Sequence, residues 1–239
     1  MRWLLITLLA AARLSAQVAA PVVVELFTSE GCSSCPPADE LLARLEREQP
    51  IAGARVIALG EHVDYWDHLG WRDPFSSRQL TVRQEQYARA LGDNGPYTPQ
   101  MVVDGVAGFV GNDGRRAAAA IAKAARERKA SVEITYANGQ VSVKVENVGR
   151  PAEVMLAITE DNLQASVSSG ENAGRKLRHV AVVRLLRALG KAKPGVVFMA
   201  EAKLPPANQW KQQDLRVVAF VQESSSRRII GAAAAPLAR

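Results

Sequence analysis

The sequence predicts a mixed α/β unit over residues 21–130, with a helical insertion, and an antiparallel β-sandwich over residues 131–239. Three observations predict this division. Near the start, two apolar β-branched runs lie on either side of an amphipathic stretch, and this order indicates a strand, a helix and a second strand. A hairpin signal and an alanine-rich helix close the first unit near residue 130. Beyond that residue, short runs of alternating apolar residues are separated by turn signals, which is typical of a sandwich.

The first residues, MRWLLITLLAAARLSAQVAAP, have the pattern of a secretory signal peptide. The apolar run at 3–12 is too short to span a bilayer comfortably, and Arg13 interrupts it. Cleavage after Ala16 or Ala20 fits the small residues there. We therefore expect residues 1–20 to be a signal peptide, a secreted and periplasmic location, and no membrane span after cleavage. A frayed apolar helix is the alternative.

Composition and charge are those of an ordinary globular protein. The chain has 239 residues, 48% of them hydrophobic and 23% charged, with a formal net charge of +6. The basic residues are scattered and lack the aromatic interleaving of a nucleic-acid-binding face, so no nucleic-acid partner is expected. The chain has no glycine-rich phosphate loop, no Gly-X-Ser-X-Gly and no zinc-type Cys/His quartet, so no cofactor is expected either.

The first unit opens with a βαβ pattern. Residues 22–28, VVVELFT, form a continuous apolar run that is typical of a strand buried on both faces. Residues 38–49 place leucines on one helical face and charges on the other. Residues 55–59, RVIAL, predict a second buried strand. Strand, helix and strand together predict a right-handed βαβ crossover.

The only two cysteines, Cys32 and Cys35, lie between the first strand and its helix, in SEGCSSCPP. A bridge over so few residues removes little loop entropy, so chemistry explains the pair better than a structural role. A helix N-terminus presents unpaired N–H groups and the positive end of the dipole, which lower the pKa of a nearby thiol. We expect Cys32 to be the exposed nucleophile and Cys35 the more buried resolving cysteine. A metal site and an inert disulfide are the alternatives.

Residues 61–96 are predicted to be an insertion that contains one helix. Ser76 or Ser77 would cap this helix, which runs to about Leu91. The rest of the first unit is predicted to contain strands over 101–103 and 106–110, joined by an Asp-Gly turn, and a helix over 115–129.

The second unit begins with a strong hairpin signal, because Asn138-Gly139 separates two strictly alternating runs. A helix over 180–189 is the main alternative to one of the later strands. Those later strands are predicted near 153–159, 176–187, 195–203 and 215–222.

The placement of the cysteines, together with Thr98-Pro99 before the hairpin, resembles the thioredoxin fold. In that fold the proline is cis and lies against the cysteine pair. The resemblance therefore implies that Pro99, supported by Thr98, shapes a groove for a substrate strand. Thioredoxin has Gly-Pro between its cysteines, whereas this chain has Ser33-Ser34, so its reducing character is not carried over.

Four segments resemble more narrowly the secreted bacterial family catalogued as domain of unknown function 1223. They are VELFTSEGCSSCPPAD, HVDYWDHLGW, YTPQMVVDG and, at 170–184, GENAGRKLRHVAVVR. The resemblance covers nearly all of the chain after the leader. It implies a fold and a compartment, but the family has no established reaction.

Two more residues are candidates for a supporting role. The strand over 55–59 ends just before His62, so His62 should share a sheet edge with the cysteines. It could assist proton transfer from Cys35, complete a copper site with Cys32 and Cys35, or only satisfy the loop backbone. Glu25 could be a buried carboxylate beneath the pair that relays protons, or it could lie elsewhere on the sheet face or at its edge.

The leading hypothesis is a periplasmic thiol–disulfide oxidoreductase in which Cys32 and Cys35 react and Pro99 shapes the groove. Its partners would be protein thiols or disulfides and a redox recycling partner. The alternatives are a soft-metal carrier and a non-catalytic envelope binding module. For His68 we expect only that it satisfies the backbone of the insertion, and for His179 a solvated strand face.

Overall fold

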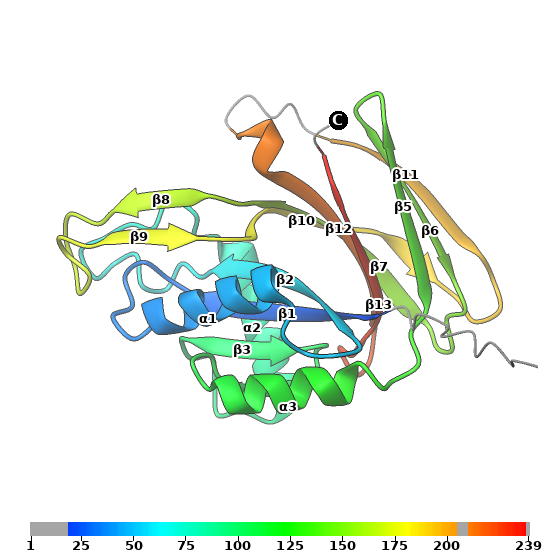
Figure 1. The fold of residues 1–239 in the computed structure, drawn as a ribbon, viewed down its shortest axis with the longest axis horizontal. Helices are drawn as coiled ribbons and strands as arrows, with labels where there is room; N and C mark the ends of the chain where they lie inside the picture. The colour runs from blue at the N-terminus through cyan, green and yellow to red at the C-terminus, as the bar shows by residue number, and fades with distance from the viewer. Residues whose placement is uncertain (1–18, 205–209, 238–239) are drawn as a thin grey trace, which may run out of the picture.

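The computed structural model describes residues 19–204 and 210–237 and has a mixed α/β fold with one large sheet and few helices (Figure 1). This confirms the coarse fold class predicted from the sequence. The predicted signal peptide, residues 1–20, lies outside the described residues except for its last positions, 19 and 20. Within the described ranges, no helix is long and apolar enough to cross a membrane.

An eight-stranded sheet runs through the molecule in the order β13-β12-β7-β10-β2-β1-β3-β4. β1 and β2 are parallel, as the βαβ pattern predicts. The pairing of β10 with β2 is also parallel, and the other neighbouring strands are antiparallel. The strands are β1 (Ala20–Thr28), β2 (Ala54–His62), β3 (Gln100–Val103), β4 (Ala107–Val110), β7 (Ala152–Glu160), β10 (Val182–Ala192), β12 (Leu215–Glu223) and β13 (Ile229–Pro236).

Helices cover both faces of the β1–β4 part of this sheet. Val24 faces Leu42 and Ile121 in one apolar cluster, while Phe27 on the opposite face packs edge-on against Tyr87. Both faces of β1 are therefore buried, which explains why its sequence is continuously apolar. The helices are α1 (Pro36–Glu48) and α3 (Gly114–Ala124) on the first face and α2 (Arg78–Leu91) on the second.

A three-stranded sheet, in the order β11-β6-β5, covers the other half of the large sheet (Figure 1). Its hairpin turns at Asn138 and Gly139, both at positive φ, as the Asn-Gly signal predicts. Alternate residues of β6 are buried, and Val143 packs in one cluster with Leu156 of β7. The strands are β5 (Ser131–Ala137), β6 (Gln140–Glu146) and β11 (Phe198–Lys203).

The two halves of the chain share one sheet at Gly60. Its N–H donates to the carbonyl of Ala181 at 2.8 Å, and Val182 is its partner in the parallel pairing of β10 with β2. A Cβ at Gly60 would lie 3.0 Å from the carbonyl oxygen of Val180, so glycine permits this close approach. The predicted domain boundary near residue 130 stays a prediction, but strands on both sides of it belong to one sheet.

A separate hairpin projects beside α1 and is formed by β8 (Leu163–Ser166) and β9 (Lys176–His179) (Figure 1). The predicted strand over 176–187 is thus two strands, because Ala181 adopts a positive φ between β9 and β10. The alternative helix over 180–189 is wrong.

The boundaries of the other elements differ less from those predicted from the sequence. Ser77 caps α2, as predicted, by accepting a hydrogen bond from the N–H of Gln79. α3 ends at Ala124 rather than near residue 129, because the next residues form a turn. Two strands, β8 and β13, were not predicted. β13 contains the alanine run 232–235, and alanine is a weak strand signal.

Candidate active site

Cys32 and Cys35 form a disulfide in the loop between β1 and α1. Cys35 is the N-cap residue of α1, and its carbonyl accepts the N–H groups of Ala38 and Asp39 at 2.8 and 3.1 Å. Prolines occupy the first turn, where helical N–H groups have no partner in any case. Ser34 Oγ lies 3.4 Å from Cys32 Sγ. The structure therefore places both sulfurs at the positive end of a helix, as the sequence predicts.

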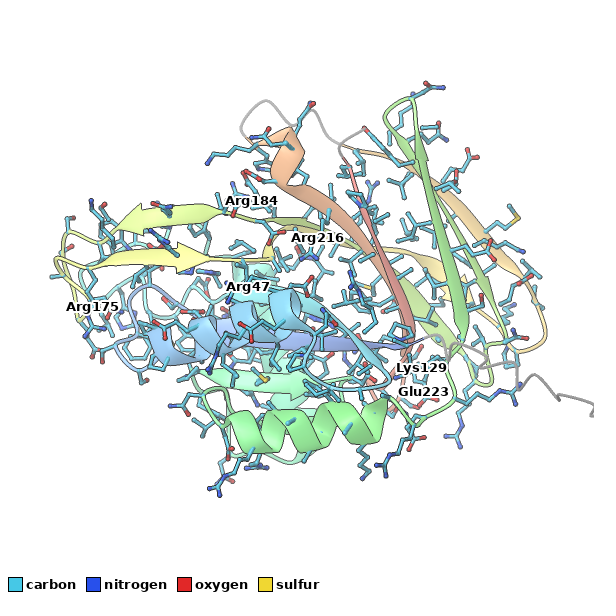
Figure 2. All side chains as sticks on the ribbon, in the orientation of Figure 1. Arg47, Lys129, Arg175, Arg184, Arg216 and Glu223 are labelled. Carbon is cyan, nitrogen blue, oxygen red and sulfur yellow. A yellow bond between two sulfur atoms is a disulfide. The ribbon has the colours of Figure 1, made fainter. Side chains whose placement is uncertain are left out.

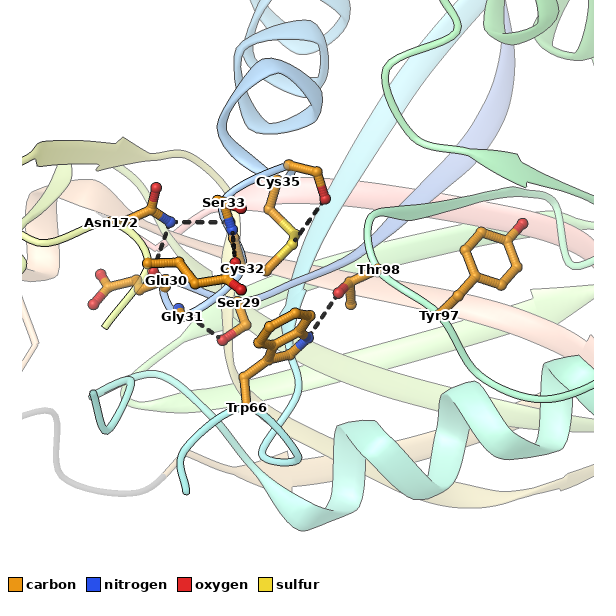
Figure 3. The surroundings of a disulfide bond; sticks show 12 residues. Ser29, Glu30, Gly31, Cys32, Ser33, Cys35, Trp66, Tyr97, Thr98 and Asn172 are labelled. Carbon is orange, nitrogen blue, oxygen red and sulfur yellow. Dashed lines mark hydrogen bonds between the residues drawn. A yellow bond between two sulfur atoms is a disulfide. The ribbon is translucent and has the colours of Figure 1, made fainter. Parts of the chain in front are cut away.

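The expected exposure of Cys32 is wrong. Both cysteines are fully buried, with 0% of their surface exposed. Trp66 covers one side of the disulfide loop, since its Cβ lies 3.1 Å from the position that a Cβ on Gly31 would take. The indole N–H of Trp66 donates to Thr98 Oγ1 at 2.8 Å, and Figure 3 shows both residues beside the disulfide. The Thr98-Pro99 peptide bond is cis.

The second cover comes from the loop between β8 and β9, residues 167–175, which we call the cap segment. Asn172 in this segment is fully buried, and its amide donates to the carbonyls of Glu30 and Cys32 at 2.8 and 2.9 Å (Figure 3). The carboxylate of Glu171 accepts the N–H of Ser33 at 3.0 Å, and hydrogen bonding to the side chain and backbone of Ser33 lowers the pKa of Glu171. The cap segment thus closes over the disulfide loop by direct hydrogen bonds.

A buried polar network lies next to the disulfide loop. Glu30 is fully buried; its carboxylate accepts the indole N–H of Trp71 at 2.8 Å and lies 3.0 Å from His179 Nε2. The N–H of Glu30 donates to Asp73 Oδ2, which also lies 2.7 Å from His62 Nδ1. The two imidazole rings pack edge-on, with centroids 4.8 Å apart. β1, β2, β9 and the insertion therefore meet in one hydrogen-bonded cluster.

Two carboxyl groups near this cluster have shifted pKa values. Burial would raise the pKa of Asp73, but His62 and backbone N–H donors outweigh it and hold that pKa below its usual value. Burial raises the pKa of Asp39 to about 7, against the attraction of His179. Asp39 follows Cys35 by one helical turn on α1, so the two side chains lie on the same side of the helix. Asp39 can therefore exchange a proton close to neutral pH at a position one helical turn from Cys35.

Replacing Asp39 with asparagine is expected to change how stability depends on pH. The folded pKa of about 7 lies above the ordinary pKa of an aspartate, so the folded protein binds this proton more tightly than the unfolded chain does. The contribution of Asp39 to stability is full below about pH 4 and falls as the pH rises to 7. Asparagine cannot ionise, so the Asp39→Asn variant gains stability relative to the wild type between pH 5 and pH 8.

Urea unfolding at pH 5 and pH 8 measures this difference. Glu40→Gln, which changes an exposed carboxylate at the next position of α1, is the matched control. The explanation fails if the stability difference between Asp39→Asn and the wild type is the same at both pH values.

Glu25 is buried, but its hydrogen bonds do not go to the disulfide. Its carboxylate accepts bonds from Arg83 and from Tyr87 of α2, both at 2.6 Å. α2 covers the opposite face of the sheet from α1, so Glu25 belongs to a different cluster. Glu61 lies in the same cluster, 3.3 Å from Arg83, and burial followed by the charge of Glu25 raises its pKa.

The structure does not bring Cys32, Cys35 and His62 together as metal ligands. His62 Nδ1 is engaged by Asp73, and the described residues contain no group of three His, Cys, Asp or Glu side chains arranged to hold a metal ion. His68 is exposed. The expected solvated position of His179 is wrong, because this side chain is buried against Glu30.

Several residues of the site were not singled out by the sequence analysis: Glu30, Asp39, Trp71, Asp73 and Asn172. Glu30 and Asp39 lie within the motif around the cysteines, and Asn172 lies in the family-like segment GENAG. The family-like motifs thus included Glu30, Asp39 and Asn172 and could have pointed to them. Nothing in these motifs showed that segments so far apart in the chain would meet.

Two comparisons with known proteins find matches over most of the chain. The model of a family described as "Protein of unknown function (DUF1223)" matches residues 23–222. A crystal structure of protein AGR_C_4864 from Agrobacterium tumefaciens is 30% identical, with 94% of this chain and 97% of that chain covered and a TM-score of 0.75. No curated protein matches.

Other solved structures are much less similar. A domain of the outer membrane lipoprotein Omp28 from Porphyromonas gingivalis is 12% identical, over 45% of this chain and 86% of that chain, with a TM-score of 0.28.

Proposed function

Because the chain belongs to the DUF1223 family, which has no assigned function, we propose from its own geometry that it is a thiol–disulfide oxidoreductase. One observation carries the proposal: the Cys32–Cys35 disulfide lies at the N-terminus of α1, after a buried parallel strand. A helix N-terminus stabilises a thiolate, so a cysteine there is a good leaving group in disulfide exchange. The order β1-α1-β2, then β3-β4-α3, supports a thioredoxin-like arrangement of this half.

The exchange we propose takes two electrons from a protein dithiol. A substrate thiolate attacks Cys32 Sγ, the Cys32–Cys35 bond breaks, and Cys35 leaves as a thiolate that takes a proton from Asp39. The second substrate thiolate then attacks the substrate sulfur of the mixed disulfide, and Cys32 leaves as a thiolate. The substrate ends as a disulfide and the protein as a dithiol. A disulfide-bearing recycling partner reverses these steps.

The buried state of the disulfide adds one requirement. Cys32 Sγ has no exposed surface, so a substrate thiolate reaches it only after Trp66 or the cap segment moves. The hydrogen bonds of Asn172 to the disulfide loop oppose this movement. The structure is therefore that of the oxidised protein with its cap segment closed, a form in which the disulfide is protected from exchange. A disulfide persists in an oxidising compartment outside the cytosol, so the proposal includes a periplasmic location for the protein.

The test uses two single cysteine variants with an aryl disulfide whose leaving thiolate is coloured. In Cys35→Ser, the remaining thiolate of Cys32 attacks the probe and stays as a mixed disulfide, with one coloured thiolate released per chain. In Cys32→Ser, the remaining thiol is the resolving one, and we expect its reaction to be at least tenfold slower. Mass spectrometry of the adduct identifies the modified cysteine.

A second measurement tests catalysis. With glutathione disulfide present as the disulfide that re-oxidises the protein, wild type is expected to speed the oxidation of a reduced, unfolded protein, and Cys32→Ser/Cys35→Ser is expected to be inert. Equal activity of the wild type and this double variant would refute the proposal and leave a non-catalytic binding role. Circular dichroism shows whether each variant keeps the fold.

A further inference from the structure

A pocket of about 540 Å³ lies between α1 and the β8–β9 hairpin. Its volume is in the range of small-molecule sites. Arg44 and Arg47 line it from α1, Gln164 from β8, and Arg178 from β9. Figure 2 shows Arg47 on α1, on the side of the helix that faces the hairpin. Neither cysteine lines this pocket, although Asp39 and His179 belong both to its walls and to the cluster beside the disulfide loop.

The charges on its walls favour an anion. Arg44 and Arg178 are exposed and have no acidic partner among the described residues, while Arg47 pairs with Glu48 at 2.9 Å. Two unpaired guanidinium groups on opposite walls, one from the helix and one from the hairpin, suit the bidentate binding of a carboxylate or phosphate. Charge at the mouth of a pocket also raises the local concentration of an oppositely charged ligand.

Two carboxyl groups, Asp39 and Glu40, also line this pocket and oppose the binding of an anion. Glu40 is exposed, so water weakens its repulsion. Burial raises the pKa of Asp39 to about 7, so near neutral pH this group is often uncharged and can donate a hydrogen bond. The balance of charge on the walls is therefore positive.

A buried polar atom at the pocket has no partner. His179 lines the pocket with only 4% of its surface exposed. Its Nε2 is engaged by Glu30, and its Nδ1 has no hydrogen-bond partner among the described residues. Buried polar atoms in folded proteins are nearly always hydrogen-bonded, so this one points to a group that the chain itself does not supply.

We propose that this pocket binds a small anion through carboxylate or phosphate oxygens, held by Arg44 and Arg178, with a polar group of the ligand meeting Nδ1 of His179. The proposal does not rest on the redox chemistry of the cysteines. Only the measurement of anion binding decides it, and the result of the disulfide-exchange test does not affect it.

The experiment is isothermal titration calorimetry of the full chain after its leader, at pH 7 and low salt, with citrate and with inorganic phosphate as separate probes. We expect saturable binding of one ligand per chain for at least one probe. Binding of citrate alone identifies a carboxylate ligand, and binding of phosphate alone identifies a phosphate ligand. Arg44→Ala/Arg178→Ala is expected to weaken binding at least tenfold. Both arginines are exposed, so this variant should fold.

The matched control removes two exposed arginines from another basic pocket. Arg128 and Arg150 line a cavity of about 520 Å³ near β13, so Arg128→Ala/Arg150→Ala loses the same charge elsewhere. This control should bind like the wild type. The proposal is overturned if neither probe binds at millimolar concentration, if Arg44→Ala/Arg178→Ala binds like the wild type, or if the control loses affinity equally.

Discussion

Replacing Asn172 with alanine is expected to speed reduction of the Cys32–Cys35 disulfide by about 30-fold. The amide of Asn172 makes two hydrogen bonds that hold the cap segment on the disulfide loop. Each contributes about 1 kcal/mol, so their loss favours the open state by about 2 kcal/mol, or roughly 30-fold in its population. Reduction that passes through the open state speeds up in proportion, because opening and closing are fast compared with attack by a thiol.

Stopped-flow reduction with a small phosphine or dithiol measures this rate, and the released thiols are counted with an alkylating agent. Asn112→Ala, which removes an exposed asparagine from the loop before α3, is the control and should match the wild type. Glu171→Ala removes the single contact to Ser33 from an exposed position, and it should give a smaller gain of about threefold. Equal rates for Asn172→Ala and the wild type would show that the cap segment does not control access.

Replacing Arg83 with methionine is expected to lower the free energy of unfolding by about 3–5 kcal/mol. Arg83 is 4% exposed and lies 2.6 Å from Glu25 and 3.3 Å from Glu61, both fully buried. Its guanidinium also donates to Tyr87 and Gln222 at 2.9 and 3.1 Å. Removing the guanidinium that contacts both carboxyl groups leaves them without their paired cation in a low-dielectric interior.

Urea unfolding monitored by fluorescence gives the change in free energy. Arg78→Met, at the start of the same helix and with its side chain 64% exposed, is the matched control and should cost less than about 1 kcal/mol. In the Arg83→Met background, Glu25→Gln should recover part of the loss, because it removes one buried charge. A loss below about 1 kcal/mol for Arg83→Met would show that this cluster does not need its cation.

Local sequence signals predicted the elements that position the cysteines. The apolar run of β1, the amphipathic pattern of α1 and the prolines after Cys35 each depend on neighbouring residues, so they could be recognised without the fold. The same holds for the Asn138-Gly139 turn and for the cap of α2 at Ser77, since turn and cap chemistry is local.

The parts that could not be predicted depend on contacts between distant segments. In VVVELFT both faces of the strand are buried, so the pattern does not show which helix Glu25 meets. Asn172, which bonds the carbonyl of Cys32, lies 140 positions later in the chain, so the motif around the cysteines does not show that this loop is covered. Likewise, the single sheet arises because β10 pairs with β2 at Gly60, a parallel contact between halves that a local pattern does not encode.

The order of segments along the chain also bears on biosynthesis. Asn172 emerges 140 residues after Cys32, so the thiols are synthesised long before the segment that will cover them. During that interval an oxidant can reach both sulfurs freely. Once β8 and β9 dock beside α1, the cap segment covers the Cys32–Cys35 disulfide. The disulfide can therefore first form before the cap segment docks, whereas each later exchange and each re-formation of the bond requires the finished protein to open.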